Sequence, residues 1–238
     1  MHMISVVIPE YNEEERIVRC LGSYEDQDVE EDFEVIVVDN ASTDRTAEIA
    51  RSYAQKINLR IITESKKGRG AARRRGFLEA RGEIILSTDA DCAAPKNWIS
   101  VMAAALRNSQ GAAISGGYAI EDLPRSEAMV FNIIQSSAAR LYRIYFHHWW
   151  LYGFNFGIYK KIYDQSGGFN ADLNAQEDID LSMRVSALGR IKFIPKIKIF
   201  FSGRRFNGGV MRGLKPYQTT FVQLYRREEK DIHLDDPR

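Results

Sequence analysis

Two aspartates at the end of an apolar run have the clearest chemical potential in this sequence. Ser87-Thr88-Asp89-Ala90-Asp91 follows directly after Glu83-Ile84-Ile85-Leu86. Side chains alternate along extended backbone, so Asp89 and Asp91 are predicted to face one point just beyond a strand. Two carboxylates there suit a divalent cation that keeps its other coordination positions for water and phosphate. A loop capped by aspartates is the structural alternative.

Two other polar segments follow apolar runs in the same way. Pro9-Glu10-Tyr11-Asn12 comes after residues 3–8, and Asp39-Asn40-Ala41-Ser42 comes after residues 33–38. In open parallel sheets, ligands bind beyond the carboxyl ends of the strands. Three polar loops at that edge favour a binding site over three unrelated caps.

The elements that must position these loops alternate between strand and helix in the first half of the chain. Strands are predicted at 3–8, 33–38, 59–62 and 83–88, and helices at 13–24, 42–56, 70–80 and from 95 onwards. Near-continuous apolar strands joined by helices predict a mainly parallel sheet with both faces covered. In the less regular second half we expect strands at 112–120, 152–159, 191–194 and 197–200, and helices at 128–146, 178–188 and 210–230.

The composition is that of an ordinary globular protein. The chain has 238 residues, of which 45% are hydrophobic and 27% charged, enough for a single α/β domain over residues 1–238. A net charge of +1 gives no bulk attraction to nucleic acid, which is not expected as a partner. We predict a cytoplasmic protein for three reasons. Two cysteines are too few for a disulfide framework, no run of about 18 apolar residues could span a bilayer, and no signal-peptide pattern is found.

Several segments, in this order, resemble the inverting family 2 glycosyltransferases, which have the GT-A fold. The similarity extends over about residues 4–206. In it, Arg74 replaces the asparagine usual in the family. The segments are Val6-Val7-Ile8-Pro9-Glu10-Tyr11-Asn12-Glu13-Glu14, Val37-Val38-Asp39-Asn40-Ala41-Ser42-Thr43-Asp44, Gly68-Arg69-Gly70-Ala71-Ala72-Arg73-Arg74-Arg75-Gly76, the Asp89-Ala90-Asp91 strand end, Gly167-Gly168-Phe169, Gln176-Glu177-Asp178-Ile179-Asp180-Leu181 and Ser202-Gly203-Arg204-Arg205-Phe206.

This resemblance implies a fold, a division of the chain and an activity. The fold would be α/β of the GT-A type, a mainly parallel nucleotide-binding sheet flanked by helices, with smaller mixed strands on the acceptor side. Residues 3–110 would bind the nucleotide sugar, 111–206 the acceptor, and 207–238 would form a C-terminal helix and tail. The activity would be metal-dependent, inverting transfer of a single sugar from a nucleotide-diphosphate sugar to a hydroxyl, with Mg²⁺ or Mn²⁺ as cofactor.

The resemblance also assigns expected roles to donor-side residues. Asp39 would accept a hydrogen bond from a nucleobase N–H, although helix capping is an alternative role for it. Asp91 would bind the metal directly, and Asp89 the ribose or a metal-bound water. Arg73 would pair with phosphate, whereas Arg74 and its other arginine neighbours are expected to be solvated. The remaining expected donor-binding residues are Pro9, Tyr11, Glu13, Ala90, Arg204 and Arg205.

On the acceptor side, Glu177 and Asp178 open a predicted helix. An acidic first turn that complements the helix dipole is the structural alternative. By resemblance they are the catalytic pair, with Asp178 as the general base that deprotonates the acceptor hydroxyl. The aromatic segment 142–156 and the nearby Arg140 and Arg143 suit a lipid-linked acceptor at the inner face of a membrane, whereas a packed core is the alternative.

Two other function classes remain open on the sequence alone. A sugar-phosphate nucleotidyltransferase would share the architecture, but its glycine-rich phosphate loop is missing around residues 8–14. A non-catalytic module that binds nucleotide sugars or glycans is the second. The joint presence of Asp39, Asp89, Asp91 and Asp178 favours an enzyme over such a module. A glycan or a lipid-linked molecule is the acceptor that we expect for it.

Overall fold

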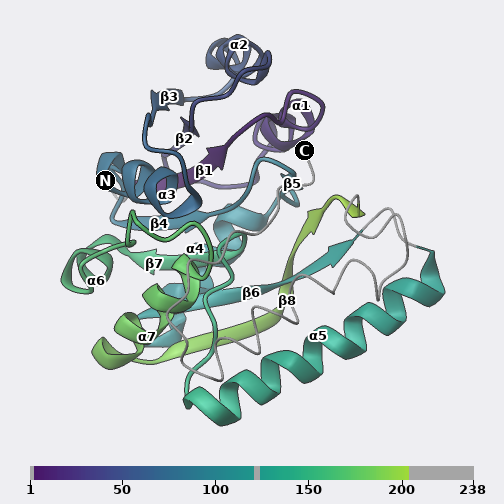
Figure 1. The fold of residues 1–238 in the computed structure, drawn as a ribbon, viewed down its shortest axis with the longest axis vertical. Helices are drawn as coiled ribbons and strands as arrows, with labels where there is room; N and C mark the ends of the chain where they lie inside the picture. Colours follow the sequence, from purple (N-terminus) through teal and green to yellow (C-terminus); the bar gives the residue numbers. More distant parts are fainter. Residues whose placement is uncertain (1–2, 121–123, 204–238) are drawn as a thin grey trace.

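The computed structural model describes residues 3–120 and 124–203, which build one large sheet flanked by helices (Figure 1). The strand order is β3-β2-β1-β4-β7-β6-β8-β5. The strands are β1 (Ile4–Glu10), β2 (Phe33–Asp39), β3 (Leu59–Thr63), β4 (Ile84–Ser87), β5 (Cys92–Ala93), β6 (Ala113–Ile120), β7 (Phe156–Tyr159) and β8 (Ile191–Phe201). The helices are α1 (Ile17–Gly22), α2 (Thr46–Ser52), α3 (Arg69–Glu79), α4 (Trp98–Ser109), α5 (Arg125–Phe146), α6 (Lys160–Gln165) and α7 (Glu177–Leu188). Arg204, Arg205 and the helix predicted at 210–230 lie outside the described residues.

The first four strands form the parallel sheet that the sequence predicts. β1 pairs in parallel with β2 and with β4, and β2 pairs in parallel with β3. Glu10 at the end of β1 lies opposite Asp39 at the end of β2. The carboxyl ends of these strands, and the polar loops that follow them, therefore meet at one edge of the sheet.

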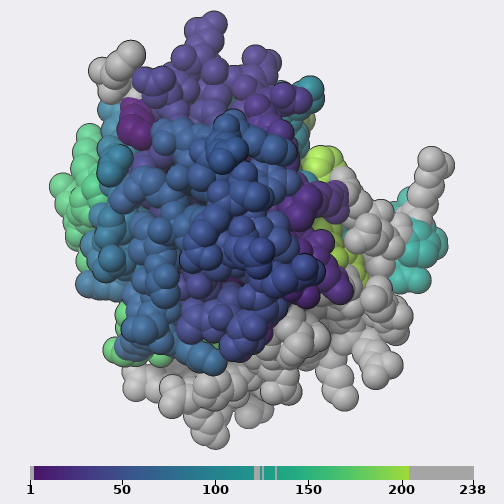
Figure 2. Space-filling view, turned by 90° about the horizontal axis from the view of Figure 1, so that it is seen from above, coloured from purple at the N-terminus to yellow at the C-terminus, as the bar shows by residue number. Residues whose placement is uncertain are grey.

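Apolar side chains cover both faces of this sheet. Alternate residues of β1, such as Ile8 and Val7, point to opposite faces. Ile8 belongs to a core cluster with α1, α2 and α4. Val7 belongs to a second cluster with α3, α6 and α7. The two-sided covering expected for buried parallel strands is confirmed. The face in Figure 2 is built mainly by the N-terminal half, drawn in purple and blue.

The second half of the sheet is mixed. β7 lies antiparallel between β4 and β6, and β6 pairs in parallel with β8. The two short strands predicted at 191–194 and 197–200 are wrong, because β8 is one strand with a register shift between Gly116 and Gly117 of its partner β6. Nδ2 of the buried Asn155 donates to the carbonyls of Gly117 at 2.5 Å and Ile197 at 3.0 Å, which holds the irregular pairing.

Helix α5 lies along the outer side of β6 and β8 (Figure 1). Its inward contacts include Phe131, which packs edge-on against Tyr118 and Phe201. Several apolar side chains on its other side are exposed to solvent. Within residues 3–120 and 124–203, no helix combines the length and apolar character needed to cross a bilayer.

Candidate active site

Arg73 is the centre of the polar cluster at this sheet edge. Its helix α3 approaches the sheet closely, because a Cβ on Gly76 would lie 2.4 Å from Cγ1 of Val7. Arg73 itself is only 3% exposed. Its Nη2 lies 2.5 Å from Oδ1 of Asp89, and its Nη1 lies 2.7 Å from Oε1 of Glu177. A buried cation thus joins the end of β4 to the start of α7.

Opposing effects act on the charge of Arg73. Burial lowers its pKa, but the carboxylates of Asp89, Glu177 and Asp178 raise it, and the net direction is upward. The guanidinium therefore keeps its charge inside the protein. Both terminal nitrogens contact carboxylates, so the contact with phosphate expected from the sequence remains a prediction.

Asp178 joins the same cluster through Gly153. Oδ2 of Asp178 accepts a hydrogen bond of 3.1 Å from the Gly153 N–H. The Gly153 carbonyl accepts one of 2.6 Å from Oγ of Ser87, the last residue of β4. A Cβ on Gly153 would lie 2.8 Å from Nη2 of Arg73, so glycine permits the close approach. Asp89, Glu177 and Asp178 are thus brought together from two distant parts of the sequence.

The surroundings of Asp178 favour its protonated form. Burial and the charge of Glu177 raise the pKa of Asp178 to about 7, against the opposing effects of Arg73, the Gly153 N–H and the Trp150 side chain. A carboxyl group that titrates near neutral pH can both accept and release a proton under working conditions.

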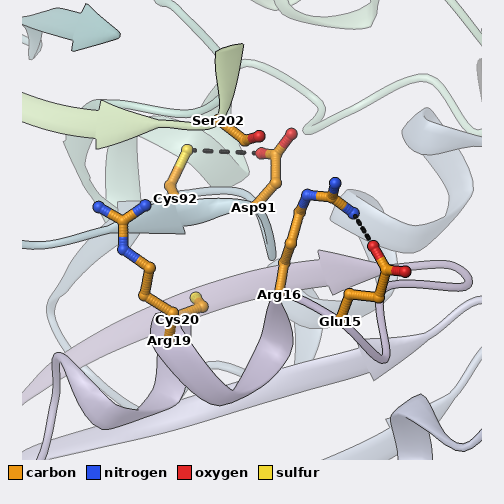
Figure 3. A pocket seen from close by; sticks show the side chains of 7 residues that line it. All are labelled: Glu15, Arg16, Arg19, Cys20, Asp91, Cys92 and Ser202. Carbon is orange, nitrogen blue, oxygen red and sulfur yellow. Dashed lines mark hydrogen bonds and ion pairs between the residues drawn. The ribbon is translucent and has the colours of Figure 1, made fainter. Parts of the chain in front are cut away.

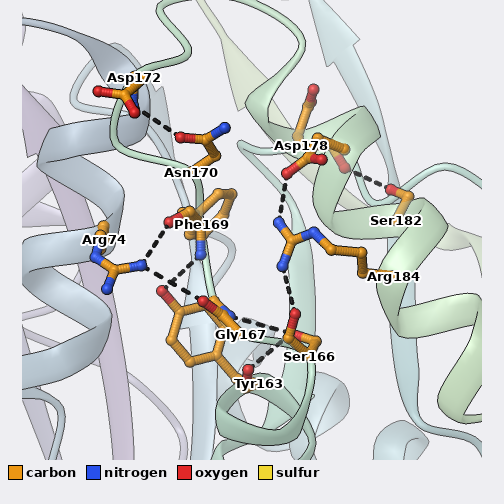
Figure 4. A network of polar contacts seen from close by, with 12 residues as sticks. Arg74, Tyr163, Ser166, Gly167, Phe169, Asn170, Asp172, Asp178, Ser182 and Arg184 are labelled. Carbon is orange, nitrogen blue, oxygen red and sulfur yellow. Dashed lines mark hydrogen bonds and ion pairs between the residues drawn. The ribbon is translucent and has the colours of Figure 1, made fainter.

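A polar network holds the start of α7 in place (Figure 4). Arg184 pairs with Asp180 on the same helix and donates to the carbonyl of Ser166. Nη1 of Arg74 donates to the carbonyl of Phe169 at 3.0 Å. The expectation that Arg74 is solvated is therefore wrong, since its guanidinium ties α3 to the segment that precedes α7.

The two aspartates of the Asp-x-Asp segment have different surroundings. Asp89 is paired with Arg73, whereas Asp91 lines a cavity of about 240 Å³ (Figure 3). The extended backbone assumed from the sequence is wrong here, because Cys92 N–H donates to the Asp89 carbonyl at 3.0 Å and closes a turn. The other residues that line the cavity are Glu15, Arg16, Arg19, Cys20, Cys92 and Ser202.

The donor set at this turn is compatible with a divalent cation. Within the described ranges, no three His, Cys, Asp or Glu side chains gather closely enough to enclose a metal. Asp89 and Asp91 are two carboxylates that follow one strand, which suits a cation that takes most of its oxygens from phosphate and water. Arg16 and Arg19 add positive charge beside Asp91, a feature that the sequence reasoning missed.

The residues expected at the nucleoside lie at the ends of β1 and β2. Pro9 and Glu10 end β1, and Asp39 ends β2. Tyr11 directly follows β1, and the centre of its ring lies 5.3 Å from Nζ of Lys67. Oδ1 of Asp39 accepts a 2.9 Å hydrogen bond from Ser42 N–H, so this carboxylate also shapes its own loop. The Glu13 N–H donates to Oγ1 of Thr46 at 2.8 Å, which joins the two loops.

Asn40 is a site residue that the sequence reasoning missed. Its Nδ2 donates to the carbonyls of Glu64 at 3.0 Å and Lys66 at 2.8 Å. Its Oδ1 accepts a hydrogen bond of 2.8 Å from the N–H of Gly68, the residue just before α3. The only available signal was its place directly after Asp39. Asn40 therefore fixes the loop that leads into the helix of Arg73.

Comparison with known proteins identifies the family of this chain. The family model described as "Glycosyl transferase family 2" matches residues 5–170. The chain belongs to this family. The dolichyl-phosphate beta-glucosyltransferase of Mus musculus is 33% identical over 187 residues, covering 70% of this chain and 53% of that protein. Membership of a glycosyltransferase family disfavours the nucleotidyltransferase alternative.

Solved structures show the same fold at low sequence identity. TarS of Staphylococcus aureus in complex with UDP has a TM-score of 0.67 at 22% identity, over 85% of this chain and 60% of TarS 1-349. The mannosyltransferase PcManGT from Pyrobaculum calidifontis, in complex with GDP-Man and Mn²⁺, has a TM-score of 0.69 at 23% identity, over 96% of this chain and 65% of that one. The expected GT-A fold is confirmed. The chain spans between 16% and 53% of the length of the curated relatives that it matches.

Proposed function

We propose that this chain transfers one sugar from a nucleoside-diphosphate sugar to a hydroxyl acceptor, with inversion at the anomeric carbon. The observation that carries the proposal is the cluster in which Arg73, Asp89, Glu177 and Asp178 meet beside the carboxyl ends of the parallel strands. It joins the expected donor residues to an acid whose protonation changes near neutral pH.

Asp178 is the proposed general base. It accepts the proton of the acceptor hydroxyl while the hydroxyl oxygen forms a bond to the anomeric carbon. The bond between that carbon and the diphosphate oxygen breaks at the same time, and its electron pair leaves with the nucleoside diphosphate. One base and one displacement give inversion. The partner role of Glu177 is electrostatic, because its charge raises the pKa of Asp178.

The donor is proposed to lie across the ends of β1, β2 and β4. Asp39 accepts from the nucleobase N–H, while Pro9, Tyr11 and Glu13 line the nucleoside, and Ala90 lies between the two metal-binding aspartates. Asp91 and Asp89 would hold Mg²⁺ or Mn²⁺, which neutralises charge on the departing diphosphate when bound. Arg73 positions Asp89. Arg204 and Arg205 remain proposed donor contacts.

A turnover assay with a panel of nucleotide sugars tests this function. We expect nucleoside diphosphate to be released with at least one sugar nucleotide, and release to stop after EDTA treatment and return with Mn²⁺. The Asp91→Asn variant should lose the response to Mn²⁺. A protein that binds sugar nucleotides but releases no nucleoside diphosphate would instead be the non-catalytic module considered above.

The acceptor is proposed to be lipid-linked, with α5 as the contact to the lipid surface. Exposed apolar side chains recur on one side of this helix, and Arg140 is exposed among them. Such a helix binds an interface by its apolar side, while arginine binds phosphate. The name of the mouse relative specifies dolichyl phosphate, which supports this acceptor class. The exposed apolar residues are Met129, Val130, Ile133, Leu141, Ile144 and Tyr145.

Flotation with vesicles that contain anionic lipid tests this contact. The wild type should float with the vesicles, and the Ile133→Glu/Ile144→Glu variant should remain at the bottom of the gradient. Leu78→Glu is the matched control, because Leu78 is an exposed apolar residue on α3. Equal flotation of both variants would contradict the role of α5.

A further inference from the structure

Glu10 is a buried acid directly beside the proposed nucleobase reader. It ends β1 opposite Asp39, which ends β2. Paired residues of neighbouring parallel strands point to the same side of the sheet and lie about 5 Å apart. Glu10 is 3% exposed, whereas Asp39 is half-buried and reaches the surface. Any ligand at this edge would therefore meet Asp39 first, with Glu10 behind it.

A single hydroxyl stabilises an ionised carboxylate at Glu10, and it reaches only one of the two oxygens. Its Oε2 accepts a hydrogen bond of 3.0 Å from Oγ of Ser42. Its Oε1 is shut off from solvent, and no N–H or O–H group donates to it. An ionised carboxylate would leave this oxygen charged and without a donor, which is costly in a buried position. A protonated carboxyl group carries no charge there, and its O–H can donate to the neighbouring Asp39 side chain.

The charged groups around Glu10 act in the same direction. They come from the end of β2 and from the loop before α2, and both Asp39 and Asp44 are acidic. Asp44 is well supplied with donors: it accepts from the N–H groups of Glu14 and Thr46, and from Oγ1 of Thr46. Although burial opposes it, these hydrogen bonds lower the pKa of Asp44. Asp44 therefore remains an anion that repels a negative charge on Glu10.

We propose that Glu10 holds a proton and shares it with Asp39, so that the two acids form one singly charged pair that reads the nucleobase. The inference rests on the proposed function for its ligand. Glu10 is a positioning residue: it acts through Asp39, whose carboxyl group accepts the hydrogen bond from the nucleobase N–H.

The electrostatics agree with this arrangement. Burial and the charges of Asp39 and Asp44 raise the pKa of Glu10 to about 8, although the Ser42 hydroxyl lowers it, and the side chains of Glu10 and Asp39 are within hydrogen-bonding reach. Above that pH, two negative charges would face each other at the ends of β1 and β2. Repulsion would then displace Asp39 from its place beside Ser42 and weaken nucleotide binding.

The first test is direct titration of Glu10 in the full chain without nucleotide. The carboxyl carbons of ¹³C-labelled glutamate are followed by NMR from pH 4 to 9.5, and Glu10→Gln assigns the signal by its loss. We expect the Glu10 signal to move near pH 8. A signal that moves at the ordinary value for glutamate, about 4.3, overturns the proposal.

The second test is the affinity for UDP and GDP, measured by calorimetry with Mg²⁺ between pH 6.5 and 9. In the wild type, affinity should fall by about tenfold from pH 7 to pH 9, as expected when only the protonated protein binds. Glu10→Gln keeps an N–H donor in a side chain of the same shape, and this donor does not titrate. The affinity of this variant should therefore change less than twofold from pH 7 to pH 9, after correction for ionisation of the nucleotide.

The matched control is Glu30→Gln, since Glu30 is exposed and lies before the start of β2, whereas Asp39 is at the other end of that strand. It should follow the wild type. The same pH dependence in the wild type and in Glu10→Gln overturns the pairing. A wild type that binds neither nucleotide at any pH contradicts the proposed function, while the NMR titration still decides whether Glu10 holds the proton.

Discussion

Two groups of acids, each with one buried glutamate, lie at the same edge of the sheet, and they differ in how their charge is balanced. In the cluster of Asp89, Glu177 and Asp178, the guanidinium of Arg73 supplies positive charge at 2.5 and 2.7 Å. In the pair of Glu10 and Asp39, the surrounding charged group is the acidic Asp44. The first cluster is balanced mainly by a cation, and the second by a proton.

The difference shows how the same residue types acquire different chemistry. A carboxylate beside a fixed cation stays ionised unless burial and a second acid offset the cation, as happens at Asp178. A buried acid beside another acid keeps its proton, as at Glu10. The first arrangement suits proton transfer, and the second suits recognition of an N–H group.

Replacing Asp178 should have the largest effect on the Arg73 side. Asp178→Asn keeps the shape but removes the base, so we expect turnover to fall by about 10²–10⁴-fold. Nucleotide affinity should stay within about twofold, since Asp178 is proposed to act on the acceptor and not on the nucleotide. Steady-state turnover and calorimetry measure both quantities. Asp172→Asn, an exposed residue paired with Lys66, is the control. An equal loss of turnover and nucleotide affinity would contradict the assignment.

Removing the positive charge of Arg73 should leave the cluster of Asp89, Glu177 and Asp178 with uncompensated negative charge. In Arg73→Met, Asp89 and Glu177 lose the positive charge that joins them, and breaking a buried pair in this way destabilises proteins by about 3–5 kcal/mol. Denaturant unfolding measures the change. Arg75→Met is the control, because Arg75 on the same helix makes an exposed pair with Glu79. It should change stability by less than about 1 kcal/mol. Similar losses in both variants would show that Arg73 is not buried among carboxylates.

A methyl group at Gly153 should disturb the geometry while keeping every charge. The new Cβ would lie 2.8 Å from Nη2 of Arg73, whose guanidinium is held on two sides. We expect Gly153→Ala to lose about 1–3 kcal/mol of stability, measured by thermal unfolding. Gly22→Ala is the matched control, because its Cβ would meet only Oη of Tyr53 at 3.9 Å. A stable and fully active Gly153→Ala variant would argue against a tight cluster.

The pH profile sharpens the comparison with a smaller effect. The proposed base Asp178 could accept a proton only when ionised, and its pKa is raised to about 7. The kcat/KM value should therefore fall below pH 7 by about tenfold per pH unit. The residual kcat/KM of the Asp178→Asn variant should not show this fall below pH 7. A wild-type profile that is flat from pH 5 to 7 would assign the base to another group.

The sequence predicted the strand ends well, and for a physical reason. A buried parallel strand is a continuous apolar run, so the point where Asp39 or Asp89 interrupts it marks the sheet edge. Asp178 was placed by its motif at a helix start, and α7 begins at Glu177. These features are local, and a local pattern determines them.

The features that were missed depend on contacts between distant segments. Gly153 links Ser87 to Asp178, and nothing in its own neighbourhood indicates this. Arg74 reaches the carbonyl of Phe169 across 95 positions of the chain. We predicted extended backbone at Asp89, but the structure has a turn there, because the Cys92 N–H donates to the Asp89 carbonyl. Such tertiary contacts leave no periodic signal in the sequence.

The stereochemistry of the product tests the central claim most directly. If Asp178 acts as the single base in a direct displacement, the sugar must leave the donor with one anomeric configuration and appear in the product with the opposite one. Proton NMR of the anomeric signal, recorded while the reaction proceeds, distinguishes the two. We predict an inverted product from the first turnover onwards. A product that retains the donor configuration would contradict the account.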